Sequence, residues 1–308
     1  MFLKWRFKVV DFSDKMSGYT QKKLNIMVIM AHPADTFDHC GGTLLHHVRR
    51  GDNVTLVAVL QGIRVHDEVV SDKLRFTGGG YKKEEAKTLR DDRGLIKNQE
   101  VINACKILGI DDVRFMGVED KINLVNETDI IAIAKLIREV KPDILITHYP
   151  KSNMGIGQHP QVGNMVVQAM MFAGNVDFDD QNPAHRTPQM LFAFPDNFNF
   201  KSTALDADTT CYCDLFVDVS DVVEEITRAR NCMNSQQYSG NYAKKSIETS
   251  FGVNGNRMKT GYAEPFIRYK PELTYYLPLP ERMERWANET EKEQLERRAY
   301  MVAPYVNL

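Results

Sequence analysis

Residues 24–43 read LNIMVIMAHPADTFDHCGGT, and this stretch decides the fold class of the chain. Leu24 to Met30 is an apolar run rich in Ile, Met and Val, short enough for a buried strand and too short for an independent helix. His32 and Asp35 follow the end of that strand, and Leu44 to Arg49 then begins a helical pattern. In an open α/β sheet, ligands bind beyond the carboxyl ends of the strands. This His-x-x-Asp pair is therefore well placed to bind a metal.

Apolar strands alternate with helical patterns along the following residues. Further buried strands are expected at Asn53 to Leu60, Asp112 to Met116 and Asp143 to Thr147, and helices at Leu95 to Leu108, Thr128 to Val140 and His159 to about Phe172. Such alternation implies parallel pairing with right-handed crossovers. The sequence predicts a Rossmann-like, doubly wound α/β fold with a mostly parallel sheet and helices on both faces. The G-x-G-x-x-G spacing is absent, which disfavours dinucleotide binding.

Two further segments are expected at the edge of the sheet where His32 and Asp35 lie. The loop from Tyr149 to Gln158 follows a strand and delivers His159 to the start of a helix. His148, which ends that strand, is expected to be a core or supporting histidine. The polar segment from Gln61 to about Asp92 is expected to be a long loop that covers or builds the site.

Composition and charge narrow the class of protein. The 308 residues are 43% hydrophobic and 26% charged, with a formal net charge of -2, which is typical of a soluble globular protein and gives no general attraction to nucleic acid. No tract approaches the length of a membrane span, and residues 1–23 lack the apolar core of a signal peptide. We therefore expect a cytoplasmic protein that acts on a small molecule. Its five cysteines are expected to be reduced.

The chain is expected to have three parts: an N-terminal extension (1–23), an α/β domain (24–268) and a C-terminal extension (269–308). The last part contains a proline-rich linker and a charged helix from Glu281 to Val302, whose apolar stripe is Met283, Trp286, Leu295 and Met301. This helix could pack on its own domain or on a neighbouring subunit, so a homo-oligomer is one expectation.

Several segments carry a resemblance to a known family. AHPADTFDHCGGTL resembles the A-H-P-D-D-E...G-G motif of the LmbE/PIG-L superfamily of zinc-dependent N-deacetylases, and GQHPQVGNMVVQA resembles its H-P-D-H motif. Lys97 with Glu100, then Asp120, then NSQ at 234–236 and YAEPF at 262–266 follow in the family's order. The resemblance covers residues 24–268. It implies a zinc site and places Lys97 and Asp120 near the substrate.

Two positions depart from the family pattern. Ala34 stands where the deacetylases have the Asp that acts as general base, and Val162 stands where they have a zinc-binding His. We therefore expect one divalent ion, zinc, to be held by His32, Asp35 and His159, with water completing the shell.

A general base must then come from another part of the chain. We expect it in the 61–68 segment, with His66 as first choice, Asp67 or Glu68 behind it, and His39 as a further alternative.

The same departures resemble the 4-oxalomesaconate hydratase branch of the superfamily, which has A-H-S-A-D at this position. Hydration is therefore the first functional expectation, N-deacetylation with a substituted base the second, and a non-catalytic protein that retains the fold the third. The cations Arg64, Lys73, Arg75 and Lys97 favour a carboxylate-bearing substrate, with Arg64 and Arg75 as the expected anchors.

Overall fold

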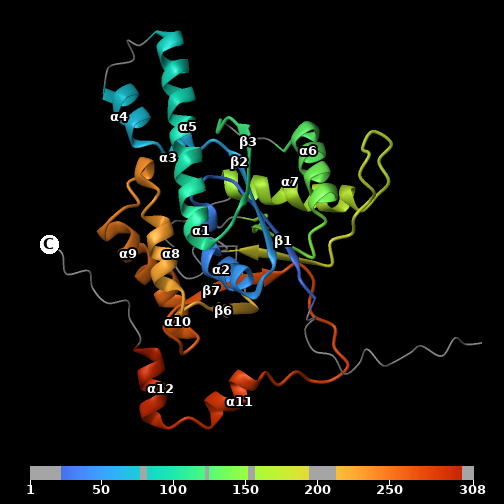
Figure 1. Ribbon diagram of the computed structural model, residues 1–308, viewed down its shortest axis with the longest axis vertical. Coiled ribbons are helices and arrows are strands. Elements are labelled where there is room, and N and C mark those ends of the chain that lie inside the picture. The colour runs from blue at the N-terminus through green and yellow to red at the C-terminus, as the bar shows by residue number, and fades with distance from the viewer. Residues whose placement is uncertain (1–21, 77–81, 122–124, 152–156, 194–212, 300–308) are drawn as a thin grey trace, which may run out of the picture.

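The computed structural model describes residues 22–76, 82–121, 125–151, 157–193 and 213–299 (Figure 1). These residues form a seven-stranded sheet of order β3-β2-β1-β4-β5-β7-β6. The strands are β1 (Asn25–Met30), β2 (Asn53–Leu60), β3 (Asp112–Val118), β4 (Ile144–His148), β5 (Gln189–Ala193), β6 (Leu215–Asp218) and β7 (Ala263–Arg268). The strands β1 to β5 pair in parallel, whereas β7 pairs antiparallel with β5 and β6. The expected α/β fold with a mostly parallel sheet is confirmed.

Strand β1 lies in the middle of the sheet, between β2 and β4. Its side chains alternate between two apolar cores. Ile26, Val28 and Met30 belong to one core, and Met27 and Ile29 belong to the other. Both faces of a central parallel strand are covered by helices, which explains why Ile26 to Met30 is continuously apolar rather than alternating.

Helices cover both faces of the sheet (Figure 1). Helices α2 (Gly41–Arg50), α5 (Lys83–Leu108) and α8 (Val223–Arg230) pack on one face, and α6 (Glu127–Val140) and α7 (Gln158–Ala173) pack on the other. The shorter helices are α1 (Asp35–His39), α3 (Ile63–His66), α4 (Glu68–Phe76), α9 (Asn241–Ile247) and α10 (Val253–Arg257), with single turns η3 (Asn234–Gln236) and η4 (Glu248–Gly252). No helix within the described ranges is long and apolar enough to cross a membrane.

The segment expected to be a long loop is helical over most of its described length. Residues 63–76 form α3 and α4, and α5 begins at Lys83 rather than at Leu95. The first turns of α5 are mostly exposed and carry no apolar stripe, so the periodicity of the sequence does not reveal them. Their Lys, Glu, Ala and Arg residues nevertheless have high intrinsic helix propensity. Residues 77–81, which include Gly78, Gly79 and Gly80, lie outside the described residues.

The C-terminal extension forms two short helices instead of the single helix expected from Glu281 to Val302. Helix α11 spans Glu281–Ala287, and α12 spans Glu291–Arg298. Thr290 starts the second helix through a capping box with Glu293. Among the stripe residues, Met283 is 60% exposed and Leu295 62% exposed, whereas Met301 lies outside the described residues. Met283 and Leu295 are therefore not buried against the α/β domain.

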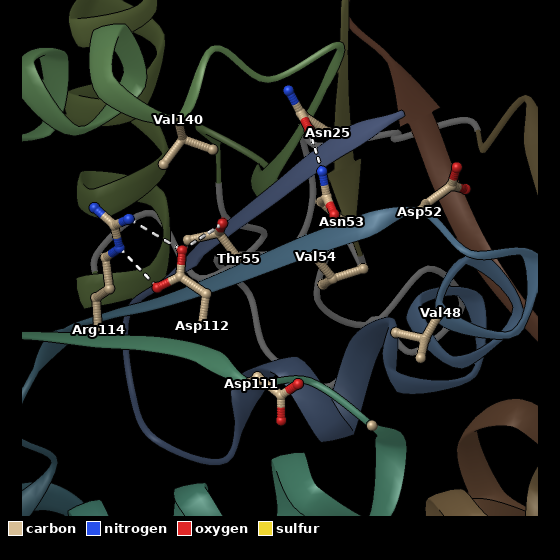
Figure 2. A pocket seen from close by; sticks show the side chains of 11 residues that line it. Asn25, Val48, Asp52, Asn53, Val54, Thr55, Asp111, Asp112, Arg114 and Val140 are labelled. Carbon is tan, nitrogen blue, oxygen red and sulfur yellow. Dashed lines mark hydrogen bonds and ion pairs between the residues drawn. The ribbon is translucent and has the colours of Figure 1, made fainter. Parts of the chain in front are cut away.

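Two cavities open at the amino ends of the strands. One, of about 400 Å³, lies beside the starts of β1, β2 and β3, where Asp112 is bound by Arg114 and Thr55 (Figure 2). The other, of about 860 Å³, lies beside the starts of β1, β4 and β5. Their described linings include none of His32, Asp35, His148 or His159. They lie at the opposite edge of the sheet from the expected metal site.

Candidate metal centre

Four polar side chains meet where β1 and β4 end. His32 follows β1, Asp35 begins α1, His148 ends β4, and His159 lies in the first turn of α7. Strands β1 and β4 are adjacent and parallel, so their carboxyl ends lie at the same edge of the sheet. This arrangement brings together side chains that are far apart in the sequence.

Three atoms of this group form a nearly regular triangle. His32 Nδ1 lies 3.1 Å from His159 Nε2, and Asp35 Oδ2 lies 3.4 Å from His32 Nδ1 and 3.5 Å from His159 Nε2. A tetrahedral zinc ion with bonds of about 2.0–2.1 Å holds its ligand atoms about 3.3–3.4 Å apart. The triangle therefore has the dimensions of one face of a zinc tetrahedron, and the fourth corner would be available to water.

The Asp35 carboxylate is held in its ionised form. Burial would raise its pKa, but the charges of His159 and His32, with hydrogen bonds from His148 and His159, hold the pKa well below its ordinary value. Asp35 Oδ2 also accepts the backbone N–H of His32 and lies 3.0 Å from His148 Nε2. A buried carboxylate that stays charged is a suitable ligand for a divalent cation.

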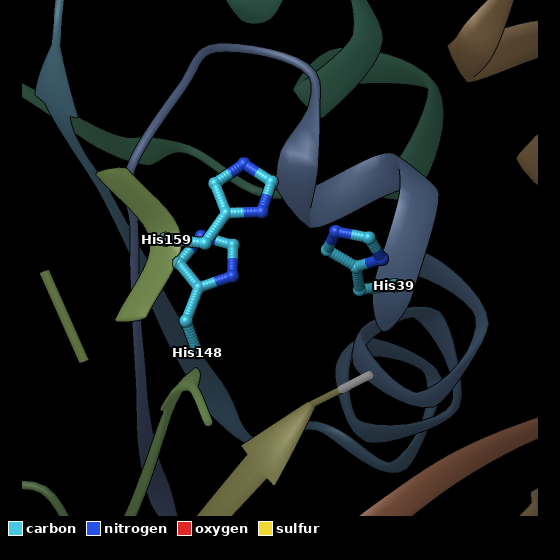
Figure 3. A group of neighbouring side chains, drawn as sticks. All are labelled: His39, His148 and His159. Atoms are coloured by element: carbon cyan, nitrogen blue, oxygen red, sulfur yellow. The ribbon is translucent and has the colours of Figure 1, made fainter. Parts of the chain in front are cut away.

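A second group of possible ligands shares His159 with the first. His39, His148 and His159 also offer nitrogen atoms within 4.8 Å of one another (Figure 3). The rings of His148 and His159 are stacked with centroids 4.2 Å apart, and His39 approaches each of them edge-on. Asp35 and His39 lie four residues apart on α1 and therefore project from one helix face. Besides the acid–base role expected for it, His39 has the position of a metal ligand.

Close packing between α7 and β4 holds His159 at the site. A Cβ atom on Gly163 would lie 2.4 Å from the backbone oxygen of His148, so only glycine allows this approach. Val162, which stands where the resembled family has a histidine, is fully buried in the apolar core of the α6–α7 face. His159 is therefore the residue of this helix that the fold presents to Asp35.

The residues expected to supply the general base have different surroundings. His66 ends α3, and its ring centroid lies 4.6 Å from that of His32 in an edge-on arrangement. Burial and the neighbouring His32 lower the pKa of His66 to about 4. Asp67 is instead buried in an ion pair with Arg93 and accepts the backbone N–H of Val70.

Glu68, the third expected candidate, is the first residue of α4 and accepts a hydrogen bond from Gln237. Of the consecutive residues His66, Asp67 and Glu68, His66 alone has a described contact with a residue of the triangle, namely His32. The role of His66 as the base stays a prediction.

Lys97 and Asp120, which were expected near the substrate, make structural contacts. The Lys97 ammonium is buried and donates to the backbone oxygen of His66 and to Ser235 Oγ. Burial lowers its pKa to about 8, although Asp67 and Glu100 favour the charged form. Asp120 accepts the backbone N–H groups at the start of α3. Both side chains therefore hold the segment that carries His66.

The two arginines expected to anchor the substrate lie on exposed surfaces. The Arg64 side chain is 54% exposed and forms an ion pair with Glu119. Arg75, near the end of α4, is also exposed. Their role in substrate binding stays a prediction, and Arg64 would have to exchange its carboxylate partner to bind a substrate.

Two supporting residues are missing from the sequence-based set. Glu264, fully buried on β7, accepts hydrogen bonds from the backbone of Gly42 and from the backbone and hydroxyl of Thr43 at the start of α2. Gln158 bonds directly to His32. The position of Gln158 beside His159 was a possible signal, whereas nothing near Glu264 in the sequence indicates its partners.

Comparison with known proteins shows which family model and which relatives this chain resembles. Residues 27–170 match the family model described as PIG-L, GlcNAc-PI de-N-acetylase. The chain is 28% identical over 153 residues to a probable N-acetyl-alpha-D-glucosaminyl L-malate deacetylase 2 of Bacillus subtilis. This aligned region covers 48% of this chain and 61% of that protein. The chain is 25% identical over 202 residues to a 1D-myo-inositol 2-acetamido-2-deoxy-alpha-D-glucopyranoside deacetylase of Thermomonospora curvata, covering 60% and 65%. The chain thus spans less than two thirds of these relatives.

Solved structures with the same fold cover more of the chain. N,N'-diacetylchitobiose deacetylase from Pyrococcus horikoshii aligns with a TM-score of 0.64 and 16% identity over 87% of this chain and 91% of that one. GalB, the 4-carboxy-2-hydroxymuconate hydratase from Pseudomonas putida KT2440, aligns with a TM-score of 0.62 and 21% identity over 82% and 99%. At these identities the likeness extends to the fold alone. The match over residues 27–170 makes just under half of the chain similar to the PIG-L family model, and the solved structures show that the α/β part has the same fold.

Proposed function

We propose that this protein is a metal-dependent hydrolase that removes an N-acyl group, most simply acetyl, from a small polar amide. The observation that carries the proposal is the triangle of His32, Asp35 and His159 donor atoms, whose dimensions suit zinc. The names of the sequence relatives support amide hydrolysis over the hydration that the sequence alone favoured.

The protein's own groups have defined tasks in this proposal. A bound zinc ion would lower the pKa of water and polarise the substrate carbonyl. His32, Asp35 and His159 would hold the ion. His39 and His148 border the same site, because their ring nitrogens lie within 4.8 Å of one another and of a ring nitrogen of His159.

His66 is the proposed acid–base residue. Ala34 cannot accept a proton, and Asp67 is already paired with Arg93. The His66 imidazole is neutral at neutral pH and can accept a proton from water. Its pKa of about 4 makes it a weaker base than an ordinary histidine but, once protonated, a stronger acid toward the leaving amine. Replacing His66 with Ala should reduce kcat by about 10²–10⁴-fold, the usual contribution of general acid–base catalysis, and leave zinc content unchanged. Full activity in this variant would move the role to His39.

Hydration of an unsaturated carboxylate is the second candidate. The observation that favours it is Ala34. This buried residue beside the site stands where the resembled deacetylases have the carboxylate of an aspartate. A polycarboxylate would need cationic partners, and Arg64 and Arg75 are the predicted ones. The third possibility, a non-catalytic protein, would show neither activity in the zinc-loaded state.

Product analysis separates the two reactions. Zinc-loaded protein is incubated with N-acetylglucosaminyl conjugates, and acetate and free amine are measured. In parallel, unsaturated di- and tricarboxylates are followed by loss of the absorbance of the conjugated double bond. The proposal predicts equal amounts of acetate and amine, lost in the His32→Ala variant. Hydroxy acid formation without acetate release would replace it with the hydratase function.

A further inference from the structure

A chain of hydrogen bonds extends from the loop after β3 to the candidate metal centre. Gln158, the first residue of α7, lies between the backbone of Lys121 and the ring of His32. Its Nε2 donates to the Lys121 oxygen over 2.7 Å, and its Oε1 lies 2.6 Å from His32 Nε2. The other nitrogen of that ring, Nδ1, belongs to the donor triangle with Asp35 and His159.

These hydrogen bonds determine which nitrogen of the His32 ring carries the proton. A backbone carbonyl can only accept, so the amide nitrogen of Gln158 must face Lys121, and its oxygen must face His32. That oxygen can also only accept, so His32 Nε2 must carry hydrogen. A neutral imidazole has one N–H group, and Nδ1 is therefore left with a lone pair directed at the triangle.

Without Gln158 the opposite tautomer would be favoured. The His32 side chain is 3% exposed, so water has little access to replace a lost acceptor. The nearby charged acceptor would then be Asp35 Oδ2, which lies 3.4 Å from Nδ1. A proton drawn to Nδ1 would occupy the lone pair that a metal needs.

We propose that Gln158 is a positioning residue that fixes the Nε2–H tautomer of His32 and so makes Nδ1 the metal ligand. The proposal rests on the proposed metal centre and deepens it, because it names which nitrogen binds and what selects it. Partners that orient ligating histidines in this way commonly contribute 10- to 100-fold to metal affinity.

Three variants test the role of Gln158 through zinc affinity, measured by competition with a chelating dye. Gln158→Leu removes both hydrogen bonds and should weaken zinc binding about 10- to 100-fold. Gln158→Glu keeps the acceptor for His32 but loses the donor to Lys121, and should retain affinity within a few fold. Gln168→Leu, an exposed position on the same helix, is the matched control and should bind like the unmodified protein.

Nitrogen-15 NMR of the histidine rings provides a readout that does not need the metal. At about pH 8, metal-free protein should show His32 as the Nε2–H tautomer, and Gln158→Leu should show Nδ1–H. His32→Gln assigns the signals. Circular dichroism and thermal unfolding establish that each variant is folded.

The outcomes distinguish this proposal from the function proposed above. Unchanged zinc affinity and tautomer in Gln158→Leu would overturn it. Equal weakening in Gln158→Leu and Gln158→Glu would also overturn it, because the tie between α7 and Lys121 would then be what matters. If the protein binds zinc as predicted but hydrolyses no amide, the proposed function fails and the role of Gln158 stands.

Discussion

Replacing Asp120 tests whether this residue caps a helix or binds substrate. Its Oδ1 accepts the backbone N–H of Ile63 over 3.2 Å, and its Oδ2 accepts those of Arg64 and Val65 over 2.8 and 3.1 Å. These are donors at the start of α3 that the helix itself cannot satisfy. Asp120 is only 3% exposed. Asp120 therefore holds the four-residue helix that ends at His66.

The expected size of the effect follows from the number of bonds lost. A hydrogen bond to a charged group contributes about 1.5–3 kcal/mol, but the three bonds share one carboxylate and the freed amides can reach water when the helix opens. We expect Asp120→Ala to destabilise α3 by about 3 kcal/mol. Asp120→Asn, with its oxygen in the place of Oδ2, keeps two bonds and should cost about 1 kcal/mol.

Hydrogen exchange of the amides of Ile63, Arg64 and Val65 measures this local stability. A loss of about 3 kcal/mol should accelerate their exchange about a hundredfold in Asp120→Ala, and the Asn variant should show less than tenfold. Asp111→Ala, an exposed carboxylate before β3, is the control. Unchanged exchange in Asp120→Ala, combined with a raised KM, would refute the capping argument and restore the substrate-binding role.

Three further predictions concern other parts of the molecule. Gly163→Ala places a methyl group against the His148 backbone oxygen, so α7 must shift. Zinc affinity, measured by competition with a chelator, should then fall at least about tenfold. Unchanged affinity would contradict this expectation. Burial raises the pKa of Glu264 to about 7, against hydrogen bonds that favour its charged form, so its stabilising contribution is present below about pH 4.5 and is lost as the pH rises through about 7. Urea unfolding across this range should show a loss of about 3 kcal/mol that Glu264→Gln does not share, and parallel profiles would contradict the argument. Leu273 and Leu277 are 98% and 97% exposed, so we expect the protein to self-associate through them. Sedimentation velocity should detect this self-association, and replacing both leucines with Ser should weaken it. An unmodified protein that is monomeric would contradict this expectation.

The fold class and the location of the candidate site could be predicted from local sequence. The short apolar run from Leu24 to Met30 favours a strand buried on both faces, and the alternation of such strands with helical patterns favours parallel pairing. Parallel pairing in turn places whatever follows β1 and β4 at one edge of the sheet. His32, Asp35 and His159 could therefore be grouped without coordinates, because their proximity follows from topology alone.

The partners of individual polar side chains were decided by the tertiary structure. Lys97, Asp120 and Arg64 carry the charges expected of substrate-binding residues, yet the described contacts bind them to His66, α3 and Glu119. The sequence gives a residue's charge but not which distant group will neutralise it. Such pairings depend on side-chain directions set by the packing of several elements at once.

The tautomer of His32 has the same origin. It depends on Gln158 and Lys121, which approach it only after β1, β3 and α7 have assembled. Local sequence therefore determined which residues reach the edge of the sheet, because strand burial and helix periodicity act over a few neighbouring positions. Only the tertiary structure decided which atoms there are free to bind a metal, because hydrogen bonds between distant segments select them.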